Sequence, residues 1–298
     1  MILARESMGD LGLTYEQLYK YYGYTRQGFH QALHRLRKIE AVIEEIKVRV
    51  CAYRNKTDVY AGSRSLFYNL DIKEIHLIGV NKFERLMQRA GLTLCRVKTR
   101  IITTRSCPKS KHFKNEINGL TINGINQVIV GDLTYVYIDN RLYYLFCLFD
   151  LYSGRMVGAF GGLRMRAIEA AQALNQVIEL RTIKSLAGCI HHTDGGSQYF
   201  SNMYLALNAK MTKSVAQSCL ENGYAEQRNG LIKIHFMPLI NGRNEKNFIN
   251  GIEFIKNTYN NIKQEGLGWL SPIEFEEKWE KLSIETRPKL KLYDFNKI

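Results

Sequence analysis

Hydrophobic and polar positions alternate with a period of two over three neighbouring segments in the middle of the chain. These segments are residues 126–138, 141–151 and 154–161, and Asp139-Asn140 and Ser153-Gly154 separate them. β-Branched and aromatic side chains at alternate positions are typical of strands, and Asn, Asp, Ser and Gly pairs between them are typical of hairpin turns. The pattern therefore predicts a three-stranded antiparallel meander.

The period changes to that of a helix after the meander. Apolar residues recur at helical spacing over 165–181, and the side chains expected to point inward are Ile168, Leu174, Val177 and Ile178. The apolar run Leu186–Ile190 then predicts a buried strand that ends at Asp194. A helix near 201–210, a short strand near 213–217 and a helix over 221–233 should follow. This order predicts an α/β fold with a ribonuclease-H-like core, in which helices flank a mixed five-stranded sheet.

The N-terminal region has only helical patterns. A short helix over Tyr15–Tyr21 and a turn at Gly23 precede Thr25, which can cap a second helix over Arg26–Lys38. One face of that helix is apolar, with Phe29, Ala32, Leu33 and Leu36. The opposite face carries the side chains expected to bind DNA, which are Gln27, His30, Gln31, His34 and Arg35. This is the pattern of a helix-turn-helix, although any small helical hairpin would give it too. Further helices are expected over 41–50 and over 81–90, the latter closed by Gly91.

The charge of the chain favours a polyanionic partner. The 298 residues carry a net charge of +14, and residues 1–125 alone hold 22 basic and 11 acidic side chains. A strip without any acidic residue contains Arg96, Lys98, Arg100, Arg105, Lys109, Lys111 and Lys114. Such a strip either tracks the phosphates of DNA or forms a flexible basic linker.

The remaining composition excludes several classes of protein. Six cysteines are scattered without a CxxC pair, which argues against a zinc site and fits a reducing cytoplasm. We find no signal peptide and no apolar segment of membrane length. The sequence therefore predicts a cytoplasmic, nucleoid-associated protein with no membrane partner.

Three acidic residues stand out by their positions. Asp132 lies within a predicted strand, Asp194 follows the end of another, and Glu226 lies in a predicted helix. Taken singly, they could be an edge-strand charge, a turn residue and a solvated helix face. Helical spacing also places Asn222, Gly230 and Lys233 on the stripe of Glu226.

Five segments carry a resemblance to a known family. They are GDLTY (131–135), RLYYLFCLFDLYSGRMVGAF (141–160), HHTDGGSQY (191–199), ENGYAEQRNGLIK (221–233) and GWLSPIEF (268–275). With them the chain resembles insertion-sequence transposases of the DDE, retroviral-integrase-like superfamily, in particular the second-reading-frame product of a two-frame element. The chain departs from the family pattern in having Ile129, Gly195 and Glu221, a shorter interval between Asp194 and Glu226, and no Arg-x-His near the C-terminus.

The resemblance implies a chemistry and a set of partners. Asp132, Asp194 and Glu226 would hold two Mg²⁺ or Mn²⁺ ions for DNA strand cleavage and strand transfer. The partners would be the terminal repeats of the element and a target, both double-stranded DNA. A homo-oligomer would hold two element ends, and the product of an upstream frame would be fused to the chain by frameshifting.

Further residues are expected to support these acids. His192 should orient the Asp194 loop by a hydrogen bond, with a satisfied structural histidine as the alternative, and the same applies to His191. Gln198 and Tyr199 would position DNA or pack the loop. Asn222 and Lys233 keep the expected offsets from Glu226, which favours Glu226 over Glu221 as the third acid, and Lys233 would meet a phosphate.

The sequence thus divides into four regions. Residues 1–92 form a helical DNA-binding region, 93–125 a basic connector, 126–283 the catalytic core and 284–298 a C-terminal tail. Two alternative functions remain open. One is a catalytically inactive, transposase-derived DNA-binding protein, and the other is a ribonuclease-H-like nuclease or resolvase.

Overall fold

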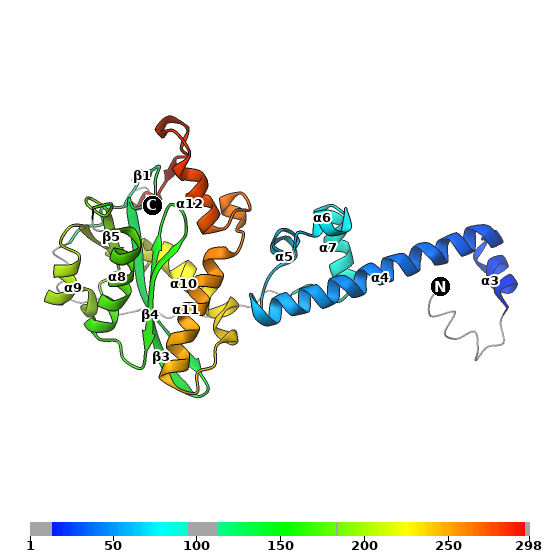
Figure 1. The fold of residues 1–298 in the computed structure, drawn as a ribbon, viewed down its shortest axis with the longest axis horizontal. Coiled ribbons are helices and arrows are strands. Elements are labelled where there is room, and N and C mark those ends of the chain that lie inside the picture. Colours follow the sequence, from blue (N-terminus) through cyan, green and yellow to red (C-terminus); the bar gives the residue numbers. More distant parts are fainter. Residues whose placement is uncertain (1–13, 95–112, 183, 296–298) are drawn as a thin grey trace.

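The computed structural model describes residues 14–94, 113–182 and 184–295. A sheet with helices on both faces forms the larger part, and helix α4 (Arg26–Lys56) extends away from it with α3 (Tyr15–Tyr22) at its far end (Figure 1). No helix in the described ranges is long and apolar enough to cross a membrane.

The N-terminal hairpin forms as its caps predict. The Thr14 side chain accepts a hydrogen bond from the Gln17 backbone at the start of α3, and Gly23 ends the helix with φ +68°. The Thr25 hydroxyl caps α4 by accepting from the backbone N–H of Gly28. The prediction of a separate helix over 41–50 is wrong, because α4 runs without a break for 31 residues. Nothing between Lys38 and residue 41 removes a backbone hydrogen bond or favours a turn.

Three shorter helices pack on the C-terminal half of α4. They are α5 (Ser63–Asn69), α6 (Ile72–His76) and α7 (Val80–Arg89). Their shared core contains Ile46, Val50, Leu66, Phe67, Ile72, Phe83 and Met87. The helix predicted over 81–90 is therefore confirmed as α7, whereas the sequence analysis did not predict α5 or α6.

The antiparallel meander is also confirmed. It consists of β2 (Val128–Ile138), β3 (Arg141–Asp150) and β4 (Met156–Gly162). Asp139 and Asn140 form the first turn with φ of 49° and 60°, a conformation that Asn and Asp tolerate better than most residues.

Two parallel strands complete the sheet, which has the order β4-β3-β2-β5-β6. These strands are β5 (Ile190–Thr193) and β6 (Thr212–Val215). The predicted start of β5 at Leu186 is wrong, because residues 184–188 form turns and Leu186 is buried there without joining the sheet. Three antiparallel strands, a crossover helix and two parallel strands form a ribonuclease-H-like fold.

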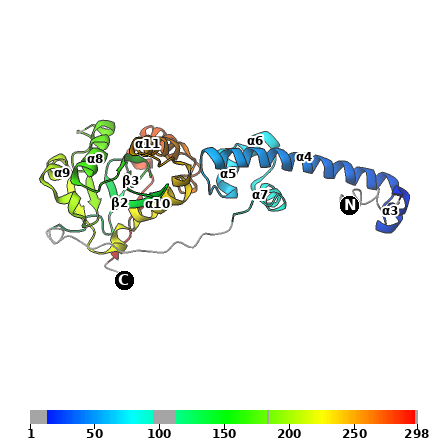
Figure 2. The same ribbon diagram turned by 90° about the horizontal axis from the view of Figure 1, so that it is seen from below.

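Helices cover both faces of the sheet (Figure 2). The α8 (Ala167–Arg181) and α9 (Asn202–Leu207) helices pack on one face, with 3₁₀ helix η2 (Ser197–Phe200). On the other face lie α10 (Gly223–His235) and α11 (Glu245–Asn261). In α8, Leu174 and Val177 are fully buried and Ile178 packs beside them, but Ile168 is 46% exposed and does not point inward as predicted.

The core extends beyond the limits of 126 and 283 that the sequence suggests. β1 (Thr121–Ile122) pairs antiparallel with β7 (Leu290–Lys291). Ile117, Ile122 and Leu292 are buried in the core beneath α10 and α11. The end of the expected connector and residues 290–292 of the expected tail thus pack on the core, through a pairing between segments far apart in the sequence.

The remaining elements lie in the C-terminal part of the core. They are the 3₁₀ helices η3 (Cys219–Asn222), η4 (Met237–Leu239), η5 (Glu265–Leu267) and η6 (Ile284–Thr286), with helix α12 (Pro272–Glu280). Tyr68 of α5 stacks on Trp269 with ring centroids 4.0 Å apart, and Lys263 contacts the side chains of Asn69 and Asp71. The helical region is thereby attached to the C-terminal side of the core.

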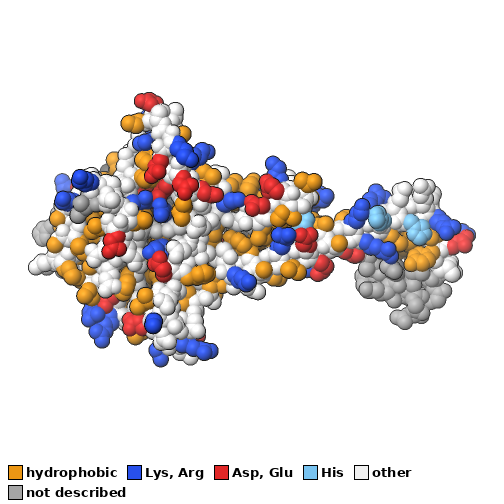
Figure 3. All heavy atoms as spheres, in the orientation of Figure 1, with side chains coloured by type: hydrophobic (Ala, Val, Ile, Leu, Met, Phe, Trp, Pro, Cys, Tyr) orange, Lys and Arg blue, Asp and Glu red, His pale blue; other side chains and the backbone are white. Residues whose placement is uncertain are grey.

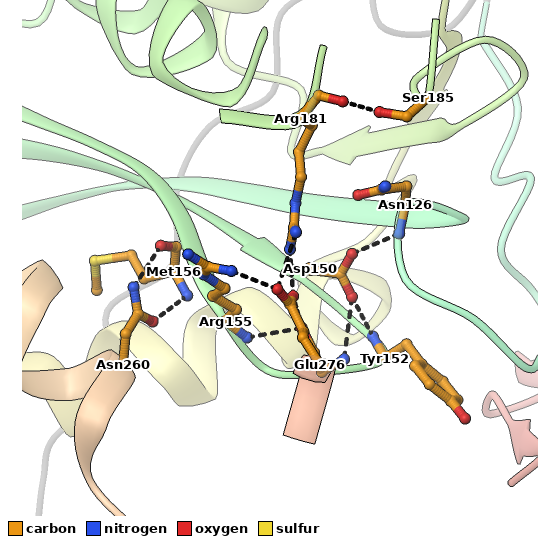
Figure 4. Close-up of polar contacts among 10 residues, drawn as sticks. Asn126, Asp150, Tyr152, Arg155, Met156, Arg181, Ser185, Asn260 and Glu276 are labelled. Atoms are coloured by element: carbon orange, nitrogen blue, oxygen red, sulfur yellow. Dashed lines mark hydrogen bonds and ion pairs between the residues drawn. The ribbon is translucent and has the colours of Figure 1, made fainter. Parts of the chain in front are cut away.

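A buried ion cluster joins α12 to the sheet (Figure 4). The Glu276 carboxylate accepts hydrogen bonds from Arg155, at 2.5 Å, and from Arg181. The Ser153 hydroxyl donates to the same carboxylate at 2.7 Å. The Asp150 carboxylate accepts hydrogen bonds from the backbone N–H of Asn126. It also accepts from the backbone N–H groups of Tyr152 and Ser153, at the start of the β3–β4 turn. The cluster fixes the position of α12, the helix that follows the family-like GWLSP segment.

Candidate active site

The register of two parallel strands places the first two acids next to each other. Gly131 of β2 and Thr193 of β5 are direct partners, and the pairing ends there. The next residues along the two strands are Asp132 and Asp194. Because neighbouring strands lie about 4.8 Å apart, both carboxylates start from adjacent backbones at one edge of the sheet.

A hydrogen bond from the backbone orients the carboxylate of the second acid, Asp194. Asp194 follows the last residue of β5, and its Oδ1 accepts a hydrogen bond of 3.1 Å from the backbone N–H of Gly196. This short turn returns the chain into η2 and keeps the carboxylate at the strand end. The two glycines 195 and 196 leave this turn free of bulky side chains.

Helix α10 brings the third acid over the same edge. Glu226 lies in its first turn and is exposed. Three residues later on the helix, the Asn229 side-chain amide donates a hydrogen bond of 2.9 Å to Oδ2 of Asp132. Glu221, the competing candidate, is occupied elsewhere, because its carboxylate accepts from the Asn115 side chain at 2.8 Å and from the Gln217 backbone at 2.9 Å.

The three carboxyl groups influence one another electrostatically. Burial, together with the charges of Asp194 and Glu226, raises the pKa of Asp132 to about 7. The hydrogen bond from Asn229 acts in the opposite direction and lowers this pKa. Burial raises the pKa of Glu226 too, and the charge of Asp194 adds to it. The pKa of Asp194 is raised by burial, against the lowering effects of Gly196 and Lys213. The ionised forms of these neighbouring carboxyl groups are therefore disfavoured.

A divalent cation fits the chemistry of these donors. Within residues 14–94, 113–182 and 184–295, no three His, Cys, Asp or Glu side chains come close enough to form a metal-binding group. The nearby donors are nevertheless all oxygens, which Mg²⁺ and Mn²⁺ prefer. The side-chain amide oxygens of Asn222 and Asn229 are buried and lack a hydrogen-bond partner. Raised carboxyl pKa values and unsatisfied oxygens fit a cation that would neutralise the charge.

The two histidines before Asp194 are buried and fully engaged. His191 Nδ1 donates to the Ile129 carbonyl at 3.2 Å, and its Nε2 accepts from the Tyr204 hydroxyl at 2.7 Å. His192 Nε2 donates to the Glu221 carbonyl at 3.2 Å, and its Nδ1 accepts from Ser214 at 2.8 Å. Burial lowers the pKa of His191 to about 3 and that of His192 to about 4, so both are neutral. They connect β5 to its neighbours and leave no nitrogen for a metal.

The two residues expected to position DNA lie on η2 and differ in exposure. Tyr199 is only 1% exposed and packs edge-on against Phe146, which favours the packing role over contact with DNA. Its hydroxyl has no hydrogen-bond partner. The Gln198 side chain is half-buried and folds back over Gly196. Both side chains thus pack the loop that carries Asp194.

The residues predicted to share one helical stripe with Glu226 lie in α10 or directly before it. Asn222 immediately precedes α10 and is buried. A Cβ at Gly230 would meet no atom within 4 Å, so the surface above this glycine is open. The Lys233 ammonium group lies 5.0 Å from the centroid of the Tyr135 ring. Burial lowers the pKa of Lys233, and the charge of Asp132 acts in the opposite direction.

The sequence analysis missed two residues near the acids. Asn229 has only its offset of three residues from Glu226 as a signal. Lys213 of β6 has none, since its role depends on strand pairing. Its ammonium group donates to the Thr193 hydroxyl at 2.6 Å and lies 5.3–5.7 Å from the ring centroids of Tyr199, Phe200 and Tyr204. Burial lowers the pKa of Lys213 to about 7, while the charge of Asp194 opposes that shift.

The residues expected to bind DNA are only partly within the described ranges. On α4, the five polar side chains of the predicted recognition face are exposed, namely Gln27, His30, Gln31, His34 and Arg35. Figure 3 shows Lys, Arg and His side chains gathered at that end of the molecule. Of the basic strip, only Lys114 is described, and it is exposed. Arg96, Lys98, Arg100, Arg105, Lys109 and Lys111 lie outside the described residues.

Comparisons with known proteins identify a domain family and several relatives. Residues 123–228, which include all three acids, match the integrase core domain family. The chain is 29% identical to the uncharacterized 31 kDa protein of insertion element IS600 from Shigella sonnei, over 88% of this chain and 98% of that protein. It is 31% identical to the transposase InsF of insertion sequence IS3A from Escherichia coli K12, over 52% of this chain and 56% of that protein. The chain thus spans just over half the length of InsF.

Two further similarities complete the comparison. The putative transposase of IS986/IS6110 from Mycobacterium tuberculosis is 28% identical over 58% of this chain and 64% of its own length. Among solved structures, the HTLV-2 integrase catalytic core domain in complex with magnesium aligns at a TM-score of 0.41 and 17% identity, covering 55% of this chain and 99% of that one. Residues 123–228 thus match an integrase core domain, and the chain is similar to insertion-sequence transposases of the DDE, retroviral-integrase-like superfamily.

Proposed function

We propose that the protein cleaves DNA strands at the ends of an insertion element and joins the freed 3′-hydroxyl to target DNA. The observation that carries this proposal is the pairing of Gly131 with Thr193, after which Asp132 and Asp194 are the next residues along two adjacent chain segments beside α10. No side-chain nucleophile is required, since water attacks in cleavage and a 3′-hydroxyl attacks in strand transfer.

Divalent ions would be held by Asp132, Asp194 and Glu226, and when bound they supply activation of the attacking oxygen and stabilisation of the leaving oxygen. These three carboxylates together would hold the two ions. Asn229 orients the Asp132 carboxylate by donating to its Oδ2. Gly196 similarly orients the Asp194 carboxylate.

DNA would be recognised at a distance from these acids. The exposed face of α4 presents amide, imidazole and guanidinium groups that can contact base edges. The net charge of +14 favours the phosphate backbone. We further propose that a homo-oligomer holds two element ends together, and that an upstream reading frame contributes a fused DNA-binding segment.

Incubation with duplex DNA from the flanks of the gene tests the proposal. With Mg²⁺ or Mn²⁺, the protein should nick the strand and join the 3′ end to a second duplex. Asp132→Asn, Asp194→Asn and Glu226→Gln should each abolish both products while DNA binding persists. Glu280→Gln, an exposed acid on α12, should leave both steps intact. Binding without cleavage would identify an inactive DNA-binding protein. Cleavage that is not followed by strand joining would identify a nuclease or resolvase.

A further inference from the structure

Helix α10 ends in a contact with the helical N-terminal region. His235, its last residue, donates a hydrogen bond of 2.7 Å from Nδ1 to Oδ1 of Asp58, which lies 177 residues earlier in the loop between α4 and α5. The His235 carbonyl accepts a second bond, of 3.1 Å, from the backbone N–H of Val59. The side chain and one of the terminal carbonyls of the helix are thus bonded to the same loop.

This loop, residues 57–62, is held within the helical region. Arg54 of α4 donates to the carbonyls of Ala61 and Leu92, both at 2.9 Å. Oδ1 of Asp58 also accepts from the backbone N–H of Tyr60 at 3.0 Å. The Asp58 side chain is only 8% exposed, so water competes little for its hydrogen bonds. A carboxylate that its own loop orients in this way fixes the end of α10 relative to the helical region.

The same helix carries two residues of the candidate active site. Asn229 lies six residues and Glu226 nine residues before His235. At a rise of 1.5 Å per residue these positions are about 9 Å and about 14 Å from His235 along the helix axis. Because one continuous helix joins the three residues, a rotation or an axial shift at His235 moves the other two as well.

Other attachments of the helical region go to residues 263–269, which follow α11. They include the stack of Tyr68 on Trp269 and the ion pair of Arg64 with Glu265, at 3.7 Å. A cavity of about 540 Å³ lies between this segment and the last turn of α10, and both Glu265 and His235 line it. The contact of Asp58 with His235 is therefore separate from these attachments, and it reaches α10 whereas they do not.

We propose that Asp58 and His235 are positioning residues, through which the helical N-terminal region sets the place of Glu226 and Asn229 at the acidic edge of the sheet. The proposal rests on the DNA-cleaving function proposed above and deepens it. The part of the chain that would recognise DNA also holds the helix that completes the catalytic geometry. Neither residue contacts DNA or metal in this role, so their loss affects the rate of the reaction rather than the binding of the substrate.

Single-turnover cleavage by the full chain, with Mg²⁺ and a range of concentrations of duplex DNA from the flanks of the gene, tests the proposal. His235→Leu removes the donor at Nδ1. It should lower the maximal rate roughly 10- to 100-fold, as a displacement of about 1 Å at the reacting groups does, and leave the half-saturating DNA concentration unchanged. His235→Asn keeps an amide N–H near the position of Nδ1 and should recover most of the loss.

Glu265→Ala is the matched control for the cleavage assay. It also breaks an ion pair between the helical region and the core, but one that does not involve α10. Both the maximal rate and the half-saturating DNA concentration should stay at the wild-type values. A loss of rate equal to that of His235→Leu would show that any weakening of the attachment impairs cleavage, and would overturn the proposal.

Hydrogen exchange in EDTA supplies a readout that needs neither metal nor cleavage. In His235→Leu, and independently in Asp58→Ala, the backbone amides of residues 223–235 should exchange faster than in the wild type. The amides of α8, on the opposite face of the sheet, should exchange at the wild-type rate.

The two assays separate this proposal from the proposed function. Unchanged exchange along α10, or equal losses of rate in His235→Leu and His235→Asn, would exclude the positioning role. Cleavage by the wild type would then still support the proposed function. Faster exchange along α10 in both variants of a chain that never cleaves DNA would support the positioning of the helix and exclude the cleaving function.

Discussion

The side-chain amide of Asn229 donates a hydrogen bond of 2.9 Å to Oδ2 of Asp132, and so connects helix α10 to the central strand of the sheet. Asn229 is buried, so this contact is protected from competition by water. It therefore orients the Asp132 carboxylate. The position of α10 therefore controls the geometry of the site.

Loss of this amide should impair catalysis without removing a proposed metal ligand. We expect Asn229→Ala to lower the rate of DNA cleavage about 10- to 100-fold, as is typical when a partner of a metal ligand is removed. The loss should be larger at limiting than at saturating Mg²⁺, because the misoriented carboxylate binds the ion less well. Initial rates across a Mg²⁺ titration measure this. Gln227→Ala, an exposed neighbour on the same helix, is the matched control. An equal loss at all Mg²⁺ concentrations would contradict an orienting role.

The assignment of the third acid predicts opposite effects for two nearby glutamates. Glu226→Gln should abolish cleavage and leave the free energy of unfolding nearly unchanged, because this side chain is exposed. Glu221→Gln should retain cleavage and reduce stability by about 1 kcal/mol, since it weakens the contacts with Asn115 and Gln217. Nicking assays and urea unfolding separate the two. Retained activity in Glu226→Gln with none in Glu221→Gln would reverse the assignment.

The raised pKa of Asp132 predicts a pH-dependent stability in the absence of metal. Between about pH 4 and pH 7 the folded protein keeps a proton on Asp132 that the unfolded chain has lost. This group therefore stabilises the fold most below pH 4, and its contribution is lost as the pH rises through 7. His191 and His192 act with the opposite sign, because burial lowers their pKa values to about 3 and 4.

Comparison with Asp132→Asn isolates the carboxyl group. Its amide oxygen can still accept from Asn229 and never ionises. The variant should be more stable than the wild type by roughly 1–3 kcal/mol at pH 8 and by much less at pH 4. Urea unfolding in EDTA at both pH values measures the difference. A stability difference that is independent of pH would show that Asp132 has an ordinary pKa.

The buried ion cluster around Glu276 predicts a large effect far from the acids (Figure 4). Glu276→Ala leaves the guanidinium groups of Arg155 and Arg181 buried without their carboxylate. Such a loss should destabilise the fold by about 3–5 kcal/mol. Glu277→Ala removes the adjacent, exposed acid and should change stability by less than about 0.5 kcal/mol. Denaturant unfolding measures both, and equal effects would show that the cluster contributes little.

Local patterns were sufficient for much of the fold. Alternating side chains and the Asp139-Asn140 turn specified the β2–β3 hairpin, because strand period and left-handed turn residues act over only a few positions. The caps at Thr25 and Gly23 likewise specified the first two helix ends. Where no local signal exists, the predictions failed, as with the start of β5 and the division of α4.

The sequence by itself determined which acids stand at a strand, a strand end and a helix, since each position follows from neighbouring residues. Only the tertiary structure decided that Asp132 and Asp194 share an edge, that Asn229 and Lys213 lie beside them, and that Tyr199 is buried. It also decided that residues 121–122 pair with 290–291. These relationships depend on strand register and helix packing, which join positions 20 to 170 residues apart and leave no periodic trace along the chain.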